Sequence, residues 1–338
     1  MSIDRRTFLK TSTIAAVLAG TRESEAGVTP ALEVATQSGD SLNPAGIRLA
    51  GVKMLPVAGG KYKVWTKRIG SSPLKVLLLH GGPGFSHEYL EAMEAFLPEA
   101  GIEMYYYDQL GCNNSDHPED PSLWTLPRYV EEVEEVRRGL GLNHFVLYGH
   151  SFGGALALEY ALKYPQHLRG LVISNMSASS EAFLRHTAKW KLQLSPPQQL
   201  QMKALEERQA YDSPEYQEIM MDVLYPQMLC RTKPWLNGFS RSLARANLRI
   251  YTQMQGQSEF LVTGNLKNWN VWGRLHEIHV KTLMIGAKYD EMDTEDMMKM
   301  AAMVSNGTYA YCPEGSHLCM WDDQAVYFQQ LLGFLHAT

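Results

Sequence analysis

The sequence predicts an α/β fold in which a mostly parallel sheet is covered by helices. Short apolar runs bounded by turn residues, at 76–79 and 145–148, are typical of buried parallel strands. Helical segments at 126–140 and 155–163 alternate with such runs, which implies right-handed crossovers between parallel strands. Between residues 177 and 268 the pattern changes to helical stretches broken by prolines, and we expect a helical cap inserted into the sheet domain.

The other elements follow from the same patterns. Further strands are predicted at 104–107, 170–174, 282–286 and 308–312, and further helices at 294–304 and 324–336. We therefore expect five segments: a twin-arginine signal peptide (1–26), a linker (27–46), the first part of the α/β core (47–176), the cap (177–268) and the second part of the core (269–338).

Composition excludes several classes of protein. Of the 338 residues 45% are hydrophobic and 20% charged, as in ordinary soluble domains. A net charge of −5 without a long basic run gives no electrostatic basis for binding nucleic acid. The four cysteines lack the spacing of a metal site, and we expect them to be small buried apolar residues.

The N-terminus resembles a twin-arginine export signal. The run from Asp4 to Lys10 contains Arg5 and Arg6 and precedes an apolar segment, 11–20, that is too short to cross a bilayer. Such a signal is an address and not a stable membrane anchor, and Ser24-Glu25-Ala26 offers a cleavage site. We expect export by the twin-arginine machinery to the periplasm or the exterior; the alternative is a basic tail on a cytoplasmic protein.

The motif Gly149-x-Ser151-x-Gly153 lies between a predicted strand and a predicted helix. This is the context of a nucleophile elbow, in which a serine occupies a strained turn and its neighbours must be glycine. The helix N-terminus would then lie under Ser151, and the amide of Phe152 could face a developing oxyanion. The fold class is therefore the α/β-hydrolase fold, with Ser151 as nucleophile.

A second glycine-rich turn, 80–84 with the sequence HGGPG, follows an earlier strand. In this fold the corresponding loop supplies a second oxyanion-hole amide, which we assign to Gly82. We expect His80 to orient this loop.

A serine nucleophile needs a base, and the base needs an orienting carboxylate. In this fold the order along the chain is Ser, Asp or Glu, then His, which selects Asp290 and His317, each just after a predicted strand. Asp293 and Asp296 fit the opening of a helix better. Four other histidines fit surface or packing positions: His144, His276, His279 and His336.

Several motifs together resemble the proline iminopeptidase family, especially its tricorn-associated members. They are HGGPG (80–84), DQLGC (108–112), the serine elbow, GAKYDE (286–291) and SHLCMW (316–321), within a similarity from about residue 62 to residue 334. The family implies removal of an N-terminal residue, often proline, from short peptides through an acyl-enzyme. It also implies that Glu259 and Glu291 bind the substrate amine, for which a carboxylate is the natural partner.

The chain departs from the family pattern beside the nucleophile, where His150 and Phe152 replace the usual residues, and at Asn113-Asn114, where Gly-Arg is usual. These changes put a strict preference for proline in question. We expect a cofactor-independent serine aminopeptidase that acts on small peptides or amino-acid amides. The alternatives are an amino-acid amidase, an esterase or an acyl-homoserine lactonase on the same scaffold, or a non-catalytic binding protein.

Overall fold

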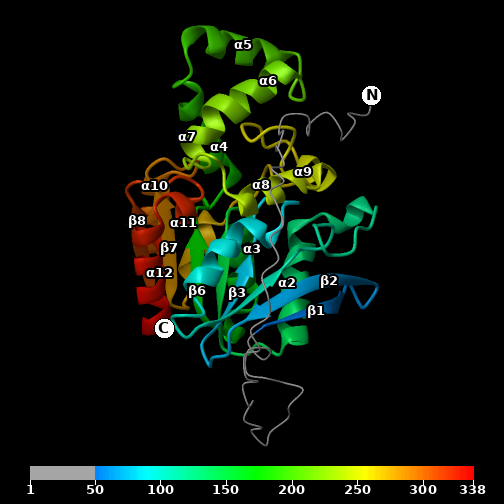
Figure 1. Ribbon diagram of the computed structural model, residues 1–338, viewed down its shortest axis with the longest axis vertical. Helices are drawn as coiled ribbons and strands as arrows, with labels where there is room; N and C mark the ends of the chain where they lie inside the picture. Colours follow the sequence, from blue (N-terminus) through cyan, green and yellow to red (C-terminus); the bar gives the residue numbers. More distant parts are fainter. Residues whose placement is uncertain (1–49) are drawn as a thin grey trace, which may run out of the picture. The chain divides into compact units, whose positions relative to one another are not determined.

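The computed structural model describes residues 50–338, so the predicted signal peptide and linker lie outside the described residues. An eight-stranded sheet with the strand order β1-β2-β4-β3-β5-β6-β7-β8 forms its centre (Figure 1). The strands are β1 (Ala50–Val57), β2 (Tyr62–Ile69), β3 (Lys75–Leu79), β4 (Glu103–Tyr107), β5 (Phe145–His150), β6 (Leu168–Ser174), β7 (Thr282–Ala287) and β8 (Gly307–Cys312).

The sheet is mostly parallel, as the sequence predicts. β1 pairs with β2 and β2 with β4 in antiparallel register, while every pair from β4 to β8 is parallel. The sequence prediction did not include β1 and β2. In β2 fully buried residues alternate with partly exposed ones, so this antiparallel hairpin lacks the continuous apolar runs that mark the inner strands.

Helices cover both faces of the sheet, and successive residues of one strand pack on opposite sides. Leu77 and Leu79 of β3 share one buried cluster with residues of α2, α3 and α10, whereas Val76 and Leu78 share another with residues of η1 and α12. The helices of the core are η1 (His87–Ala95), η2 (Pro121–Leu123), α2 (Leu126–Leu140), α3 (Phe152–Lys163), η3 (Pro165–His167), α10 (Thr294–Met303), α11 (Cys319–Asp322) and α12 (Gln324–Ala337).

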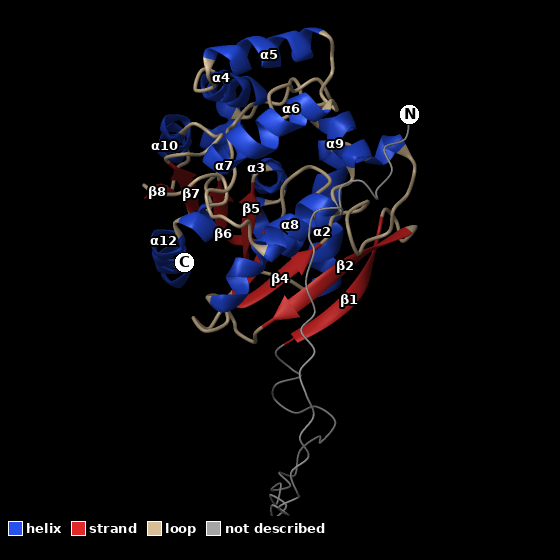
Figure 2. Cartoon of the chain, turned by 45° about the horizontal axis from the view of Figure 1, so that its top comes forward, coloured by secondary structure: helices blue, strands red, loops and turns tan. Residues whose placement is uncertain are grey.

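Along the sequence, the segment that connects β6 to β7 contains only helices and loops, many of which lie above the sheet in Figure 2. They are α4 (Ser180–Lys191), α5 (Pro196–Glu207), α6 (Pro214–Glu218), η4 (Ile219–Leu224), α7 (Tyr225–Met228), α8 (Asn237–Ala244), α9 (Leu248–Met254) and η5 (Trp272–Glu277). Trp190, Leu205 and Tyr216 belong to an apolar cluster separate from those of the sheet. Within residues 50–338, no helix combines the length and the apolarity needed to span a membrane.

The parallel strands bring distant parts of the chain to one edge. Ser151 directly follows β5, Asn175 follows β6, Asp290 lies in the loop after β7 and His317 in the segment after β8. Because the carboxyl ends of parallel strands meet at the same edge, these four residues converge there.

Candidate active site

Ser151 forms the sharp turn between β5 and α3. Its backbone has φ 55° and ψ −132°, a conformation that costs a non-glycine residue about 1–3 kcal/mol. The turn is held by a hydrogen bond from the Ser151 N–H to the carbonyl of Ser174, at 3.1 Å. The serine is thus presented at the carboxyl edge of the sheet by a strained backbone.

Steric crowding explains the glycines on either side of this serine. A Cβ atom at Gly149 would lie 2.1 Å from the carbonyl oxygen of Gly153, and one at Gly153 would lie 2.3 Å from that of Leu79. Backbone atoms cannot yield as a flexible side chain can, so the first turn of α3 can pack against the ends of β5 and β3 only if both positions are glycine.

The loop after β3 lies against the serine side chain, since a Cβ atom at Gly81 would be 3.0 Å from the Ser151 hydroxyl oxygen. Gly82, Ser151 and Phe152 line the same cavity. Within residues 50–338, the backbone N–H groups of Gly82 and Phe152 have no hydrogen-bond acceptor. Two free donors beside a hydroxyl suit an oxygen atom that gains negative charge.

Asp290 and His317 form a buried pair. His317 Nδ1 lies 2.8 Å from Asp290 Oδ1, and the two side chains are almost inaccessible to solvent. The backbone N–H of Met292 also donates to Oδ1, at 3.1 Å. The pair can fix the imidazole in one orientation, with Nε2 turned away from the carboxylate.

Asn175 also holds this carboxylate, and the sequence analysis did not identify it. Its side-chain amide donates to Asp290 Oδ2 at 2.7 Å. Asn175 has φ 56°, a left-handed conformation that asparagine tolerates better than most residues. The available signal was its place directly after a buried strand, at the same edge as Ser151.

Two further carboxylates lie beside the imidazole. Glu291 Oε1 is 3.3 Å from His317 Nε2, while Glu291 Oε2 is buried without a hydrogen-bond partner. Glu259 lines the cavity and accepts a hydrogen bond from the Tyr251 hydroxyl at 2.5 Å. The unpartnered oxygen of Glu291 gives this region an unused acceptor, which suits a donor supplied by a ligand.

These carboxylates control the charge of the site. Burial, and then the nearby charge of Glu259, hold the pKa of Glu291 well above its usual range. Burial also raises the pKa of Glu259. Burial alone would lower the pKa of His317, but the carboxylates of Glu291 and Asp290 raise it to about 9. The charged forms of these carboxylates thus favour the imidazolium form of His317.

The side chains of Ser151 and His317 are not hydrogen-bonded to each other. Among the described residues, the Ser151 hydroxyl has no hydrogen-bond partner, and His317 Nε2 faces Glu291. The ring of His317 lies close to the elbow, since its centroid is 4.7 Å from that of His150. The imidazole of His317 thus lies next to the elbow of Ser151, with its Nε2 engaged by a carboxylate.

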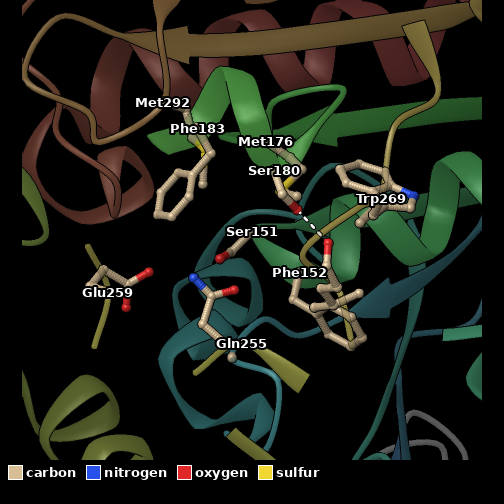
Figure 3. Close-up of a pocket in the computed structure, with 12 residues that line it drawn as sticks. Ser151, Phe152, Met176, Ser180, Phe183, Gln255, Glu259, Trp269 and Met292 are labelled. Carbon is tan, nitrogen blue, oxygen red and sulfur yellow. Dashed lines mark hydrogen bonds between the residues drawn. The ribbon is translucent and has the colours of Figure 1, made fainter. Parts of the chain in front are cut away.

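The cavity beside Ser151 is mostly apolar. In Figure 3 Gln255 and Glu259 lie on one side of Ser151, and Met176, Phe183 and Met292 lie on the other; Ser180 also lines the cavity. The apolar lining residues are Phe152, Ala155, Met176, Phe183, Leu266, Trp269 and Met292. Within residues 50–338 no group of three or more His, Cys, Asp and Glu side chains is arranged to hold a metal ion.

Comparison with known proteins agrees with this geometry. A family model described as the alpha/beta hydrolase fold matches residues 75–323. A proline iminopeptidase of Flavobacterium johnsoniae is 45% identical over 289 residues, which cover 84% of this chain and 97% of the relative. The chain also resembles the crystal structures of the Mycobacterium smegmatis proline iminopeptidase (TM-score 0.78, 27% identity) and of VinJ (TM-score 0.80, 30% identity); each match covers 85% of this chain and 98% of the other.

The contact between Glu291 and His317 predicts a specific titration. In the parent protein the His317 imidazole should lose its proton near pH 9, as followed by NMR of the ring nitrogens. Glu291→Gln removes a negative charge that favours the imidazolium, so the midpoint should fall by about 1 to 3 pH units.

The matched control for this titration is Glu314→Gln, which removes the same charge from an exposed side chain near His317 in the sequence. It should leave the midpoint almost unchanged because solvent screens its charge. An equal midpoint in the parent and in Glu291→Gln would contradict the assigned contact.

Proposed function

Because the chain belongs to the proline iminopeptidase family of α/β hydrolases, we propose that it releases an N-terminal residue, preferably proline, from small peptides or amino-acid amides. The observation that carries the proposal is the pair of carboxylates, Glu259 and Glu291, beside the base and the nucleophile. A protonated α-amino group is a cation of the right size and donor number for two such carboxylates.

In the proposed reaction, Asp290 orients His317, and His317 Nε2 takes the proton of the Ser151 hydroxyl. The serine oxygen bonds to the substrate carbonyl carbon, and the N–H groups of Gly82 and Phe152 stabilise the resulting oxyanion. The C–N bond then breaks, and the leaving amine takes the proton from His317. Water hydrolyses the acyl-enzyme by the same base.

Binding of the substrate amine would also free the base. Glu291 contacts His317 Nε2 and favours the charged form of the imidazole, which cannot accept a proton. An ammonium group between Glu259 and Glu291 would take over the interaction with Glu291. It would thereby lower the pKa of His317, so that the neutral imidazole becomes available when substrate is bound.

The cavity fits the acyl side of such a substrate. Its apolar lining suits a proline ring, and Phe183 of α4 together with Trp269 comes from the helical segment between β6 and β7. We propose that this segment acts as a cap that closes the amine side of the cavity and excludes chains extending beyond the N-terminal residue.

Amine recognition predicts a large difference between free and acetylated substrates. The kcat/KM of the full chain should be measured for proline, alanine and leucine p-nitroanilides, each with a free and an acetylated amine. Free amines should be preferred by at least about 10²-fold, because acetylation removes the cation and leaves both carboxylates unpaired. Free proline should lead the other two residues by more than about tenfold, or 1.4 kcal/mol.

The Glu259→Gln variant tests whether substrate binding needs the charge of this side chain, because the substitution keeps the size of the side chain and removes its charge. The amide can still accept the hydrogen bond from Tyr251, but it lacks the charge that binds an ammonium. The KM for free proline p-nitroanilide should rise by about tenfold or more, with little change for the acetylated compound. Equal cleavage of free and acetylated forms by the parent would replace the aminopeptidase assignment by a general amidase or esterase.

We also propose that the twin-arginine pattern of Arg5 and Arg6 directs export. In a bacterial host with this export pathway, the full chain should accumulate outside the cytoplasm, and the double variant Arg5→Lys, Arg6→Lys should remain inside. Retention of the parent in the cytoplasm would favour the alternative of a basic tail. Enzyme activity in the cell fractions provides the measurement, with a cytoplasmic marker as control.

A further inference from the structure

A buried chain of hydrogen bonds connects the oxyanion loop to the backbone of His317. The Gly81 N–H donates to the Tyr89 hydroxyl at 2.5 Å, and this hydroxyl lies 3.0 Å from His150 Nδ1. His150 Nε2 lies 2.8 Å from the carbonyl oxygen of His317. Tyr89 is 3% exposed and His150 is 1% exposed, so solvent does not compete for these bonds.

Proton positions in this chain follow from the chemistry of its ends. A carbonyl oxygen only accepts, so His150 Nε2 must carry the hydrogen that points to His317. Burial, together with the charge of His317, lowers the pKa of His150 well below its usual value, so Nδ1 carries no proton and can accept a hydrogen bond. Burial raises the pKa of Tyr89, so its hydroxyl keeps a proton to donate to Nδ1. Every bond in the chain then has one donor and one acceptor.

His150, which precedes the proposed nucleophile, therefore donates a hydrogen bond to the backbone of the proposed base. The N–H of His317 donates to Met228 at 2.9 Å, and its ring is held by Asp290. Its carbonyl is held by His150, the residue directly before Ser151 in the chain. Of these three contacts, the hydrogen bond from His150 is the one that links His317 directly to the elbow.

We propose that His150 and Tyr89 are positioning residues that fix the spacing between the oxyanion loop, Ser151 and His317. The inference rests on the proposed serine mechanism. Neither residue lines the substrate cavity, so their loss should slow the attack by Ser151 without weakening substrate binding.

Two substitutions of His150 separate this role from simple packing. His150→Leu fills the site but removes both hydrogen bonds. His150→Gln keeps an N–H group at the ε position, from which it can still donate to the His317 carbonyl. Two measurements report the effect: the second-order rate of Ser151 labelling by an alkyl fluorophosphonate, and kcat and KM for free proline p-nitroanilide.

For His150→Leu we expect labelling and kcat to fall by about 10- to 100-fold, because small misplacements of reacting groups have effects of this size. The KM should stay within about twofold of the parent. For His150→Gln both rates should recover to within about threefold of the parent. Tyr89→Phe, which removes the acceptor of the Gly81 N–H, should also lower kcat at unchanged KM.

A labelling rate of His150→Leu within twofold of the parent would overturn the inference, as would a His150→Gln variant that is folded yet as slow as His150→Leu. If His150→Leu does not fold, His150→Asn replaces it, since its shorter amide cannot reach the His317 carbonyl; equal rates for the Asn and Gln variants would then overturn the inference. If the parent itself is not labelled, the serine mechanism fails, which is a separate result.

Discussion

The site depends on the close approach of the first turn of α3 to the end of β3. No side chain fits between them, because a Cβ atom at Gly153 would lie 2.3 Å from the carbonyl oxygen of Leu79. Gly82, Ser151 and Phe152 line the same cavity, and the N–H groups of Gly82 and Phe152 have no acceptor within residues 50–338. The strained backbone of Ser151 persists because the packing around it leaves no alternative.

The second organising feature is a group of three buried carboxyl groups around one imidazole. Asp290, Glu291 and Glu259 all favour the protonated form of His317. Buried carboxylates without a cation are costly, and Glu291 meets part of this cost by contacting His317 Nε2. A substrate ammonium would supply the missing positive charge. Binding of the amine would then also free His317 Nε2 from Glu291. Only a substrate with a free amine would therefore make the imidazole available as a base.

Much of the fold and of the candidate site could be predicted because the signals are local. The sequence predicts the α/β-hydrolase fold from strand and helix patterns, and the family match confirms it. Asp293 was expected to open a helix, and its side chain caps α10 by accepting from the Glu295 N–H. Ser151, Asp290 and His317 are marked by their places shortly after predicted strands, and the structure brings the last two into contact.

What the sequence could not reveal depends on side-chain orientation across distant segments. Asn175 reaches Asp290 across 115 positions of the chain, and an asparagine after a strand is not distinctive by itself. The contact of Glu291 with His317 Nε2, and the link from Tyr89 through His150, arise only where loops from several strands pack together. The antiparallel hairpin of β1 and β2 was missed because it lacks a continuous buried apolar run; in β2 the buried residues alternate with partly exposed ones.

The most direct test of the account is the turnover of Ser151→Ala. With free proline p-nitroanilide, kcat should fall by at least about 10⁴-fold, while far-ultraviolet circular dichroism and thermal unfolding stay close to those of the parent. Ser240→Ala, which removes a hydroxyl from an exposed position of α8, should keep full activity. A Ser151→Ala protein with near-parental turnover would contradict the assignment of Ser151 as the nucleophile and, with it, the mechanism as a whole.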